Sequence, residues 1–356
     1  MIITDATRLP RLMQCLGSHY MPVPVVAADD DTTDRDEGNA AHFMAQVAFG
    51  GTPLDDLIGQ RAYNGIIMDA EMASHVRRYL ESLDCGAMEV ATTITTDRWI
   101  INARADHIVF RDGHLTVDDF KYGYRLVMPD MNWTLIAHAV GYCIENNVQP
   151  HTITLRIHQP RRYHPDGPLR EWSFDYATLC AFYQQIDERL SSGGKMLQTG
   201  TFCPTCPAAA TCPAFRDASM NALDVCSRLY SDDLPNPLLA SELDLLTQAQ
   251  TIIEGRLTAM QGLAKHKIAQ GEVVPMYGLE QQYANRKFKK GITAAAIRVL
   301  TGKDAAVEKT VTPAELARRG VNEDILALLT ERPMTGVKLV RGDPDARARR
   351  LLRKGK

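Results

Sequence analysis

The feature that most constrains the fold is a pair of strand-like segments joined by a tight turn at residues 98–123. The segment RWIINARADHIVF (98–110) partly alternates apolar and polar side chains, and LTVDDFKYG (115–123) is the next strand candidate. Between them stands Arg111-Asp112-Gly113-His114, whose Asp-Gly pair is a strong signal for a β-hairpin. The sequence therefore predicts two antiparallel strands connected by this turn.

Helical and strand-like segments surround this hairpin. We expect helices at residues 9–17, 38–50, 69–83, 131–146 and 175–191, and further strands at 87–96 and 152–158. The order is helices, a β-meander, a helix, a strand and a helix. It predicts an α/β fold in which helices flank a mixed central sheet. Residues 202–215, which contain three prolines, are expected to form a loop at the end of this domain.

The character of the chain changes after Ser231. The segment DDLPNPLL is a plausible linker, and Ser241 with Asp244 looks like the N-cap pair of an amphipathic helix that runs to about residue 270. We therefore expect a first domain at 1–230 and a smaller, mainly helical accessory module at 231–356. From Arg341 onward, seven Lys and Arg face two Asp, so this tail either binds DNA or is a solvated, frayed end.

Composition excludes several classes of protein. Apolar residues make up 45% of the chain, which argues against wholesale disorder. The net charge of −3 disfavours a passive nucleic-acid coat but not an enzyme whose site is rich in carboxylates. No segment approaches the roughly 20 apolar residues of a membrane helix, and MIITDATRLPRLMQC lacks a signal-peptide core. A cytoplasmic location without membrane contact is expected.

The two strands of the hairpin carry an acid–acid–lysine group. Asp106 lies six residues before Asp112 of the turn and Asp119 lies six residues after Gly113, so the two carboxylates can converge. Lys121 lies two residues after Asp119 and shares its face of the strand. Carboxylates hold Mg²⁺ or Mn²⁺, and a lysine can stabilise charge on a phosphate. The alternative is an ordinary solvated hairpin.

Eight cysteines occur, and three of them form Cys203-x2-Cys206-x5-Cys212. Close spacing lets a loop wrap one metal centre, and thiolates select zinc or iron–sulfur clusters. The alternatives are a zinc clip or three cysteines packed as small apolar side chains.

The order of these residues resembles the RecB-type branch of the PD-(D/E)XK nuclease superfamily over roughly residues 5–216. That branch carries a helix histidine, an acidic strand, a G-x-x-D strand, D/E-x-K and a Q-x-x-x-Y helix. The matching positions here are His42 in EGNAAH, Glu89 in MEV, Ala103 to Asp106, Asp119 to Gly123, and Thr134 with His138. Ala103 replaces the usual glycine, and Thr134 and His138 replace glutamine and tyrosine.

The resemblance implies a Mg²⁺- or Mn²⁺-dependent deoxyribonuclease, an exonuclease that hydrolyses phosphodiester bonds. His42, Asp106 and Asp119 would hold the metal, Lys121 would assist catalysis, and Glu89 would shape the site. Thr134 and His138 would contact DNA or scaffold the site, and their departures leave open a catalytically weak DNA-binding or complex-forming subunit.

In cluster-bearing members of this branch the fourth cysteine lies near the N-terminus, where this chain has Cys15. The resemblance therefore implies a 4Fe–4S cluster on Cys15, Cys203, Cys206 and Cys212, with Cys226 as the substitute for Cys15. A zinc-binding scaffold without a nucleic-acid role is the remaining alternative.

The chain is also similar to an uncharacterised phage- or prophage-borne group that joins the nuclease domain to a helical module. This similarity implies a role in phage DNA recombination or replication. Its implied partners are DNA and phage recombination or single-strand-binding proteins.

Overall fold

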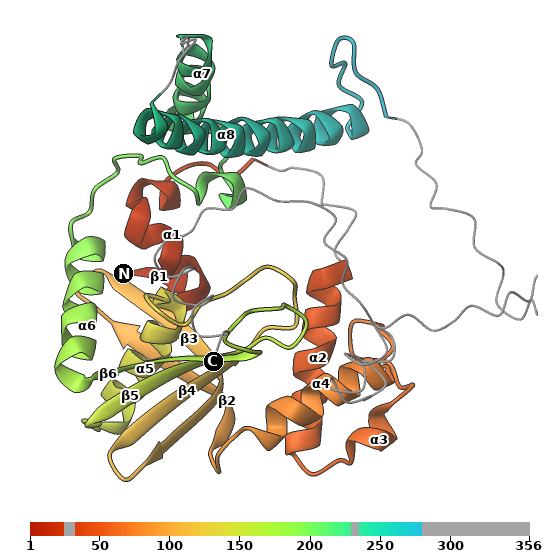
Figure 1. The fold of residues 1–356 in the computed structure, drawn as a ribbon, viewed down its shortest axis with the longest axis vertical. Helices are drawn as coiled ribbons and strands as arrows, with labels where there is room; N and C mark the ends of the chain where they lie inside the picture. The colour runs from red at the N-terminus through yellow and green to blue at the C-terminus, as the bar shows by residue number, and fades with distance from the viewer. Residues whose placement is uncertain (25–32, 229–234, 280–356) are drawn as a thin grey trace, which may run out of the picture. The chain divides into compact units, whose positions relative to one another are not determined.

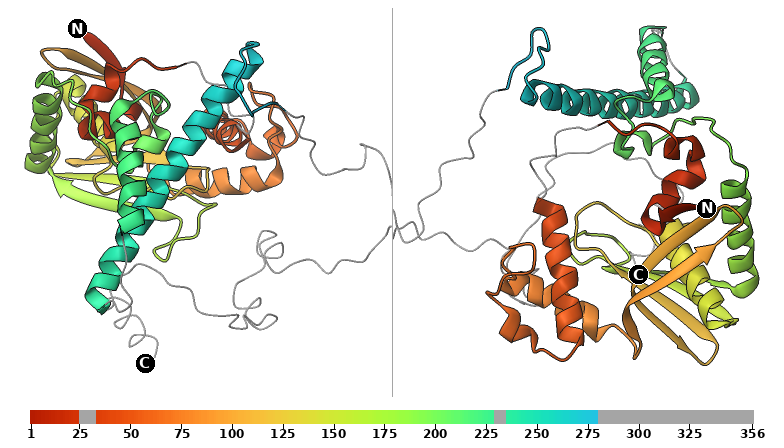
Figure 2. Two further views of the ribbon diagram at one scale, coloured as in Figure 1. Left: turned by 90° about the horizontal axis from the view of Figure 1, so that it is seen from above. Right: turned by 180° about the vertical axis from the view of Figure 1, so that it is seen from behind.

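The computed structural model describes residues 1–24, 33–228 and 235–279, with residues 33 and 225–228 described by their backbone alone (Figures 1 and 2). The described residues all belong to one compact unit. The basic tail from Arg341 lies outside the described residues, as does most of the expected accessory module. In the described ranges, no helix has both the length and the apolar character to cross a membrane.

A mixed six-stranded sheet forms the centre of this unit, which confirms the expected α/β class (Figure 1). Strands β1 and β3 pair in parallel, as do β4 and β5, while the other neighbours are antiparallel. The strand order is β1-β3-β4-β5-β6, and β2 also pairs with β3. The strands are β1 (Ile2–Asp5), β2 (Ala87–Thr95), β3 (Trp99–Arg111), β4 (His114–Phe120), β5 (Thr152–His158) and β6 (Leu169–Asp175).

One edge of the long strand β3 pairs with two different strands. Its start, Trp99–Asn102, pairs with β1, and its end, His107–Arg111, pairs with β4. Because β2 occupies the other edge along residues 100–108, a short stretch at 103–106 has no strand beside it on the first edge. The carboxyl ends of β1 and β4 point toward each other across this gap, which we call the fork.

Helices cover the sheet in two groups, each with its own core. In the first group, α1, α5 and α6 pack on the sheet around Trp99, Leu115 and Leu155. In the second, α2, α3 and α4 pack around Phe120 and Tyr122 at the end of β4. The helices, in chain order, are η1 (Ala6–Arg8), α1 (Leu9–Gln14), η2 (Leu16–His19), α2 (Thr33–Phe49), α3 (Leu54–Leu57), α4 (Ala70–Glu81), α5 (Trp133–Asn146), α6 (Tyr176–Ser191), η3 (Cys203–Thr205), α7 (Pro213–Arg228) and α8 (Asn236–Ala269).

The predicted hairpin is confirmed. Asp112 and Gly113 connect β3 to β4 with φ values of 51° and 74°, the paired left-handed conformation that a two-residue hairpin turn requires. Asp69 and Asp175 cap α4 and α6 by accepting hydrogen bonds from backbone N–H groups, so these two helices begin close to their expected positions.

Other expected boundaries were wrong. Ser241 does not start a helix: α8 begins at Asn236, and the Ser241 hydroxyl donates within the helix to the Pro237 carbonyl. Pro237 suits the first turn of a helix, where its missing N–H costs nothing. Helix α2 begins at Thr33, before the expected residue 38. The loop expected at 202–215 contains η3 and the start of α7, and β1 and β6 were not predicted.

Candidate metal centre and cysteine cluster

A cleft of about 530 Å³ opens at the fork. The sheet contributes its acidic floor, α2 contributes one wall, and the start of α5 lies opposite. The lining residues are Asp5, Thr7, Asn39, His42, Phe43, Gln46, Tyr63, Glu89, Arg104, Asp106, Asp119, Lys121, Thr134 and His138. All seven residues expected in the metal site and its scaffold therefore line one cavity.

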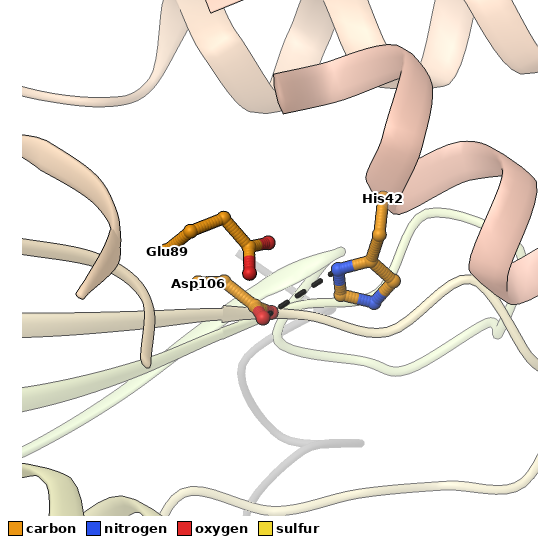
Figure 3. A group of neighbouring side chains, drawn as sticks. All are labelled: His42, Glu89 and Asp106. Carbon is orange, nitrogen blue, oxygen red and sulfur yellow. Dashed lines mark ion pairs between the residues drawn. The ribbon is translucent and has the colours of Figure 1, made fainter. Parts of the chain in front are cut away.

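Three of these side chains lie close enough to share one ion (Figure 3). Each of His42, Glu89 and Asp106 offers a ligand atom, and the three atoms lie within 4.8 Å of one another. Nδ1 of His42 lies 3.5 Å from Oδ1 of Asp106. One imidazole and two carboxylates form a donor set suited to a divalent cation that prefers oxygen and nitrogen ligands. The residues therefore fit a metal of the expected kind.

Backbone conformation and a backbone hydrogen bond position the carboxylates of Glu89 and Asp106. Glu89 lies opposite Asp106 on β2 and has a φ of 54°, which a strand residue rarely adopts. Asp106 accepts a hydrogen bond of 2.7 Å from the Phe120 N–H, so its side chain bridges the fork to the end of β4. Burial, together with the nearby Asp119 carboxylate, raises the pKa of Asp106 despite the opposing charges of His42 and Lys121.

Asp119 and Lys121 form a separate ion pair beside this trio. Nζ of Lys121 donates to Oδ1 of Asp119 at 2.7 Å and lies 2.6 Å from Oδ2. Burial opposes ionisation of Asp119, but the charge and hydrogen bond of Lys121 outweigh it and lower the pKa of the carboxyl. Burial likewise opposes the charge on Lys121, yet Asp119 and Asp106 raise the pKa of the amine. The pair is therefore charged at neutral pH.

Thr134 and His138 lie one helical turn apart on α5 and both face the cleft, as their spacing predicted. The Thr134 hydroxyl donates to the Ala6 carbonyl at 3.4 Å, which fastens α5 to the segment after β1. His138 is only 3% exposed, and its buried Nδ1 has no hydrogen-bond partner. Burial lowers the pKa of His138 to about 4, so the imidazole is neutral at pH 7.

Sequence reasoning missed half of the lining. Asn39, Phe43 and Gln46 stand three residues before, one after and four after His42, the spacing of a single helix face. That spacing was the available signal. Arg104 lies two residues before Asp106 on β3, so strand alternation was its signal. No comparable local signal marked Tyr63, because the folding of a loop brings it to the cleft.

The cysteines expected as cluster ligands also meet. Cys15, Cys203, Cys206 and Cys212 line a second cavity together with Phe202 and Phe215. Backbone N–H groups of Gln198 and Gly200 each donate to a cysteine sulfur at 3.3 Å, on Cys15 and Cys203. Burial raises the pKa of the Cys203 and Cys206 thiols. Ionising several buried thiols together requires a compensating cation, so this donor set fits a thiolate-bound metal centre.

Two contacts hold the segment around Cys15 close to residues 202–215, which we call the cysteine loop. The Arg189 guanidinium on α6 donates to the carbonyls of Leu12 and Gln14 on α1. At Gly17 the chain passes so close to the Lys195 and Met196 carbonyls that a Cβ would lie 2.6 Å from one oxygen. The side chain of Cys226, the substitute ligand, lies outside the described residues.

Helix α8 packs against η3, which begins at Cys203, and against α7 (Figure 2). Gly255 on α8 packs so closely on Pro204 that a Cβ would lie 2.5 Å from its ring. The Arg256 guanidinium donates to the carbonyls of Ala209 and Ala210 at 2.6 and 2.9 Å. The cysteine loop is therefore held between α8 and the α/β core.

Comparison with known proteins supplies a family without a known function. A family model described as "Protein of unknown function (DUF2800)" matches residues 10–345, so the chain belongs to this family. No curated protein matches the sequence. One solved structure with a significant match, titled "Crystal structure of SSO0001", is 16% identical and covers 60% of this chain and 87% of its own. Its TM-score of 0.27 is too low to support an argument about fold or function.

Proposed function

We propose that this DUF2800 chain is a Mg²⁺- or Mn²⁺-dependent deoxyribonuclease of the RecB-type PD-(D/E)XK kind, acting as an exonuclease in phage DNA recombination or replication. One observation carries the proposal. The Asp119–Lys121 ion pair lies in the same cleft as the His42, Glu89 and Asp106 trio, and their order along the chain is that of the resemblance.

Each residue then has a chemical role. His42, Glu89 and Asp106 would hold the cation, and Asp119 of the same cleft is a further candidate ligand. The bound cation would supply charge stabilisation at the phosphate and a more acidic water. Lys121 stays protonated and donates to oxygen atoms, so it suits an anionic phosphate at the moment when negative charge develops. Neutral His138 can accept or donate a hydrogen bond but adds no charge.

The test is cleavage of labelled linear, circular and single-stranded DNA with Mn²⁺, by the wild-type protein beside Asp119→Ala. We expect metal-dependent degradation by the wild type, abolished by EDTA, and at least about a hundredfold loss in Asp119→Ala, as for other groups that stabilise a transition state. Unchanged thermal unfolding of the variant controls for folding. Equal cleavage by both proteins would refute the assigned site.

A catalytically weak DNA-binding or complex-forming subunit is the second candidate. The buried, neutral His138 favours it, since it stands where the resemblance has a tyrosine. Binding of DNA without cleavage of any of the three substrates would select this candidate over the first.

We further propose a structural 4Fe–4S cluster on Cys15, Cys203, Cys206 and Cys212. The order of these cysteines, one near the start of the chain and three after the α/β core, is that of the resemblance and favours a cluster over a single zinc ion. Zinc remains the alternative.

Anaerobic purification tests the cluster. We expect iron and a broad absorbance band at about 400 nm in the wild type, a generic feature of thiolate-bound iron. Cys203→Ser is expected to lose both. Cys85→Ser is the matched control, because Cys85 is exposed and does not line the cysteine cavity. A colourless, zinc-loaded protein would overturn the assignment.

A further inference from the structure

The wall of the cleft formed by α2 carries an aromatic pair beside the metal trio. Phe43, the residue after His42, contacts Tyr63 edge to face, with ring centroids 5.7 Å apart and planes at 75°. Both rings line the cleft, and Tyr63 is 72% exposed. The other residues that line the cleft are all polar, so these two rings form its only aromatic carbocyclic surface among the described lining residues.

The loop that carries Tyr63 is held in place by hydrogen bonds. The N–H groups of Ala62 and Gly65 donate across the loop to the carbonyls of Ile66 and Ala62, at 2.8 and 2.9 Å. The Asn64 amide donates to the Asp36 carbonyl on α2 at 2.7 Å, and Ala62 is buried in the core beneath. Tyr63 therefore projects from an anchored loop, so its ordering cost is met before any ligand binds.

The chemistry around this pair suits a nucleobase. Asn39 and Gln46 carry carboxamides on the same wall of α2, and carboxamides pair with base edges through their donor and acceptor atoms. Arg104, whose side chain is 70% exposed, lines the same cleft and brings a positive charge 3.8 Å from the Glu89 carboxylate. In a bound nucleotide, the phosphate would lie near the carboxylates that hold the cation, and the base attached to that phosphate would lie near Phe43 and Tyr63.

We propose that Phe43 and Tyr63 form a stacking platform for an unpaired base next to the scissile phosphate, and that the chain acts on single-stranded DNA or frayed ends. This inference rests on the proposed nuclease function of the same cleft. A stacked base must expose its ring face, and a base inside a duplex does not. The platform therefore selects single strands without reading their sequence.

Binding assays in EDTA test the platform apart from cleavage. Anisotropy of a labelled 20-nucleotide single strand and of the matching duplex is measured for wild type, Tyr63→Ala, Tyr63→Phe and Tyr163→Ala. Tyr163 is a matched control, because it is 85% exposed and does not line the cleft. Stacking on an aromatic ring contributes enough that Tyr63→Ala should weaken single-strand binding at least about fivefold. We expect the affinity of Tyr63→Ala for the duplex to stay within about twofold of wild type. The affinities of Tyr63→Phe and Tyr163→Ala for the single strand and for the duplex should also stay within about twofold.

A 2-aminopurine base scanned along the same strand reports stacking directly. We expect quenched fluorescence at one position near the bound end, restored in Tyr63→Ala and retained in Tyr63→Phe. Unchanged affinity in Tyr63→Ala, or an equal loss on single strand and duplex, would overturn the platform. Cleavage plays no part in these measurements, so a chain that binds through Tyr63 but cleaves nothing would refute the nuclease and keep the platform.

Discussion

Asp118 and Asp119 are adjacent residues of β4, yet they belong to different parts of the molecule. Asp118 is fully buried, and its carboxylate accepts hydrogen bonds from His107, Arg156 and His158 at 2.6 to 3.1 Å. Asp119 lines the open cleft and has Lys121 as its ion-pair partner. Successive side chains of a strand point to opposite faces, which explains how neighbours reach such different surroundings.

The difference separates a structural carboxylate from one available for chemistry. Burial opposes ionisation of Asp118, but its hydrogen bonds with His107, His158 and Arg156 lower the pKa of Asp118 well below its usual range. Both of its oxygens are occupied, so it has little left to offer a ligand. In the cleft, Asp106 has a raised pKa and Asp119 shares its charge with a lysine that is partly exposed. Carboxylates held near one another without full compensation are typical of functional sites.

The largest effect is expected from Asp118→Ala. It leaves His107, Arg156 and His158 without their acceptor in the interior, and breaking a buried charge network of this kind costs about 3–5 kcal/mol of unfolding free energy. Urea unfolding followed by circular dichroism measures this loss. A loss below about 1 kcal/mol would show that Asp118 is not the structural member of the pair.

Asp106→Asn, unlike Asp118→Ala, should preserve the stability of the fold and weaken metal binding. The amide oxygen can still accept from the Phe120 N–H, and the variant relieves the repulsion with Asp119, so we expect equal or slightly higher stability in EDTA. Binding of Mn²⁺, measured by isothermal titration calorimetry, should weaken about a hundredfold, or about 2.7 kcal/mol. Clear destabilisation with unchanged Mn²⁺ affinity would make Asp106 structural as well.

At low pH, the difference in unfolding free energy between wild type and Asp118→Asn should become smaller. A carboxyl whose pKa is lowered by folding stabilises the native state above its unfolded-state pKa of about 3.9, and this contribution disappears as pH falls toward the folded-state value. Below about pH 4, the unfolding free energy of the wild type should therefore fall more steeply than that of Asp118→Asn. Parallel pH dependences in EDTA would contradict the assigned network.

The smallest effect is expected at the contact that seats α2 over the cleft. The Arg161 guanidinium pairs with Glu37 on α2 and lies over the rings of Tyr122 and Tyr124, at 4.6 and 4.3 Å. Glu37→Gln should loosen the helix that carries His42 and weaken Mn²⁺ binding about threefold, the scale of a partly exposed ion pair. Asp55→Asn, which breaks the exposed pair with Arg77, is the control. Equal effects of the two variants on Mn²⁺ binding would show that the Arg161–Glu37 pair does not support the site.

Local sequence patterns were sufficient for much of the fold. The Asp112-Gly113 turn predicted the hairpin, and the apolar periodicity of residues 69–83 and 175–191 predicted α4 and α6. The four-residue strand β1 was missed because it is too short to show a pattern, and it pairs with β3 almost a hundred residues away. Without β1 the fork cannot be foreseen.

The candidate site, like the fold, was predictable from the sequence only in part. The sequence by itself determined that Asp106 and Asp119 face each other, because a hairpin register places them there, and that Lys121 shares the face of Asp119 by strand alternation. Only the tertiary structure decided that Glu89 joins His42 and Asp106 and that Cys15 meets Cys203. Turn chemistry and periodicity act over a few residues and are written in the chain, whereas these contacts depend on how distant segments pack.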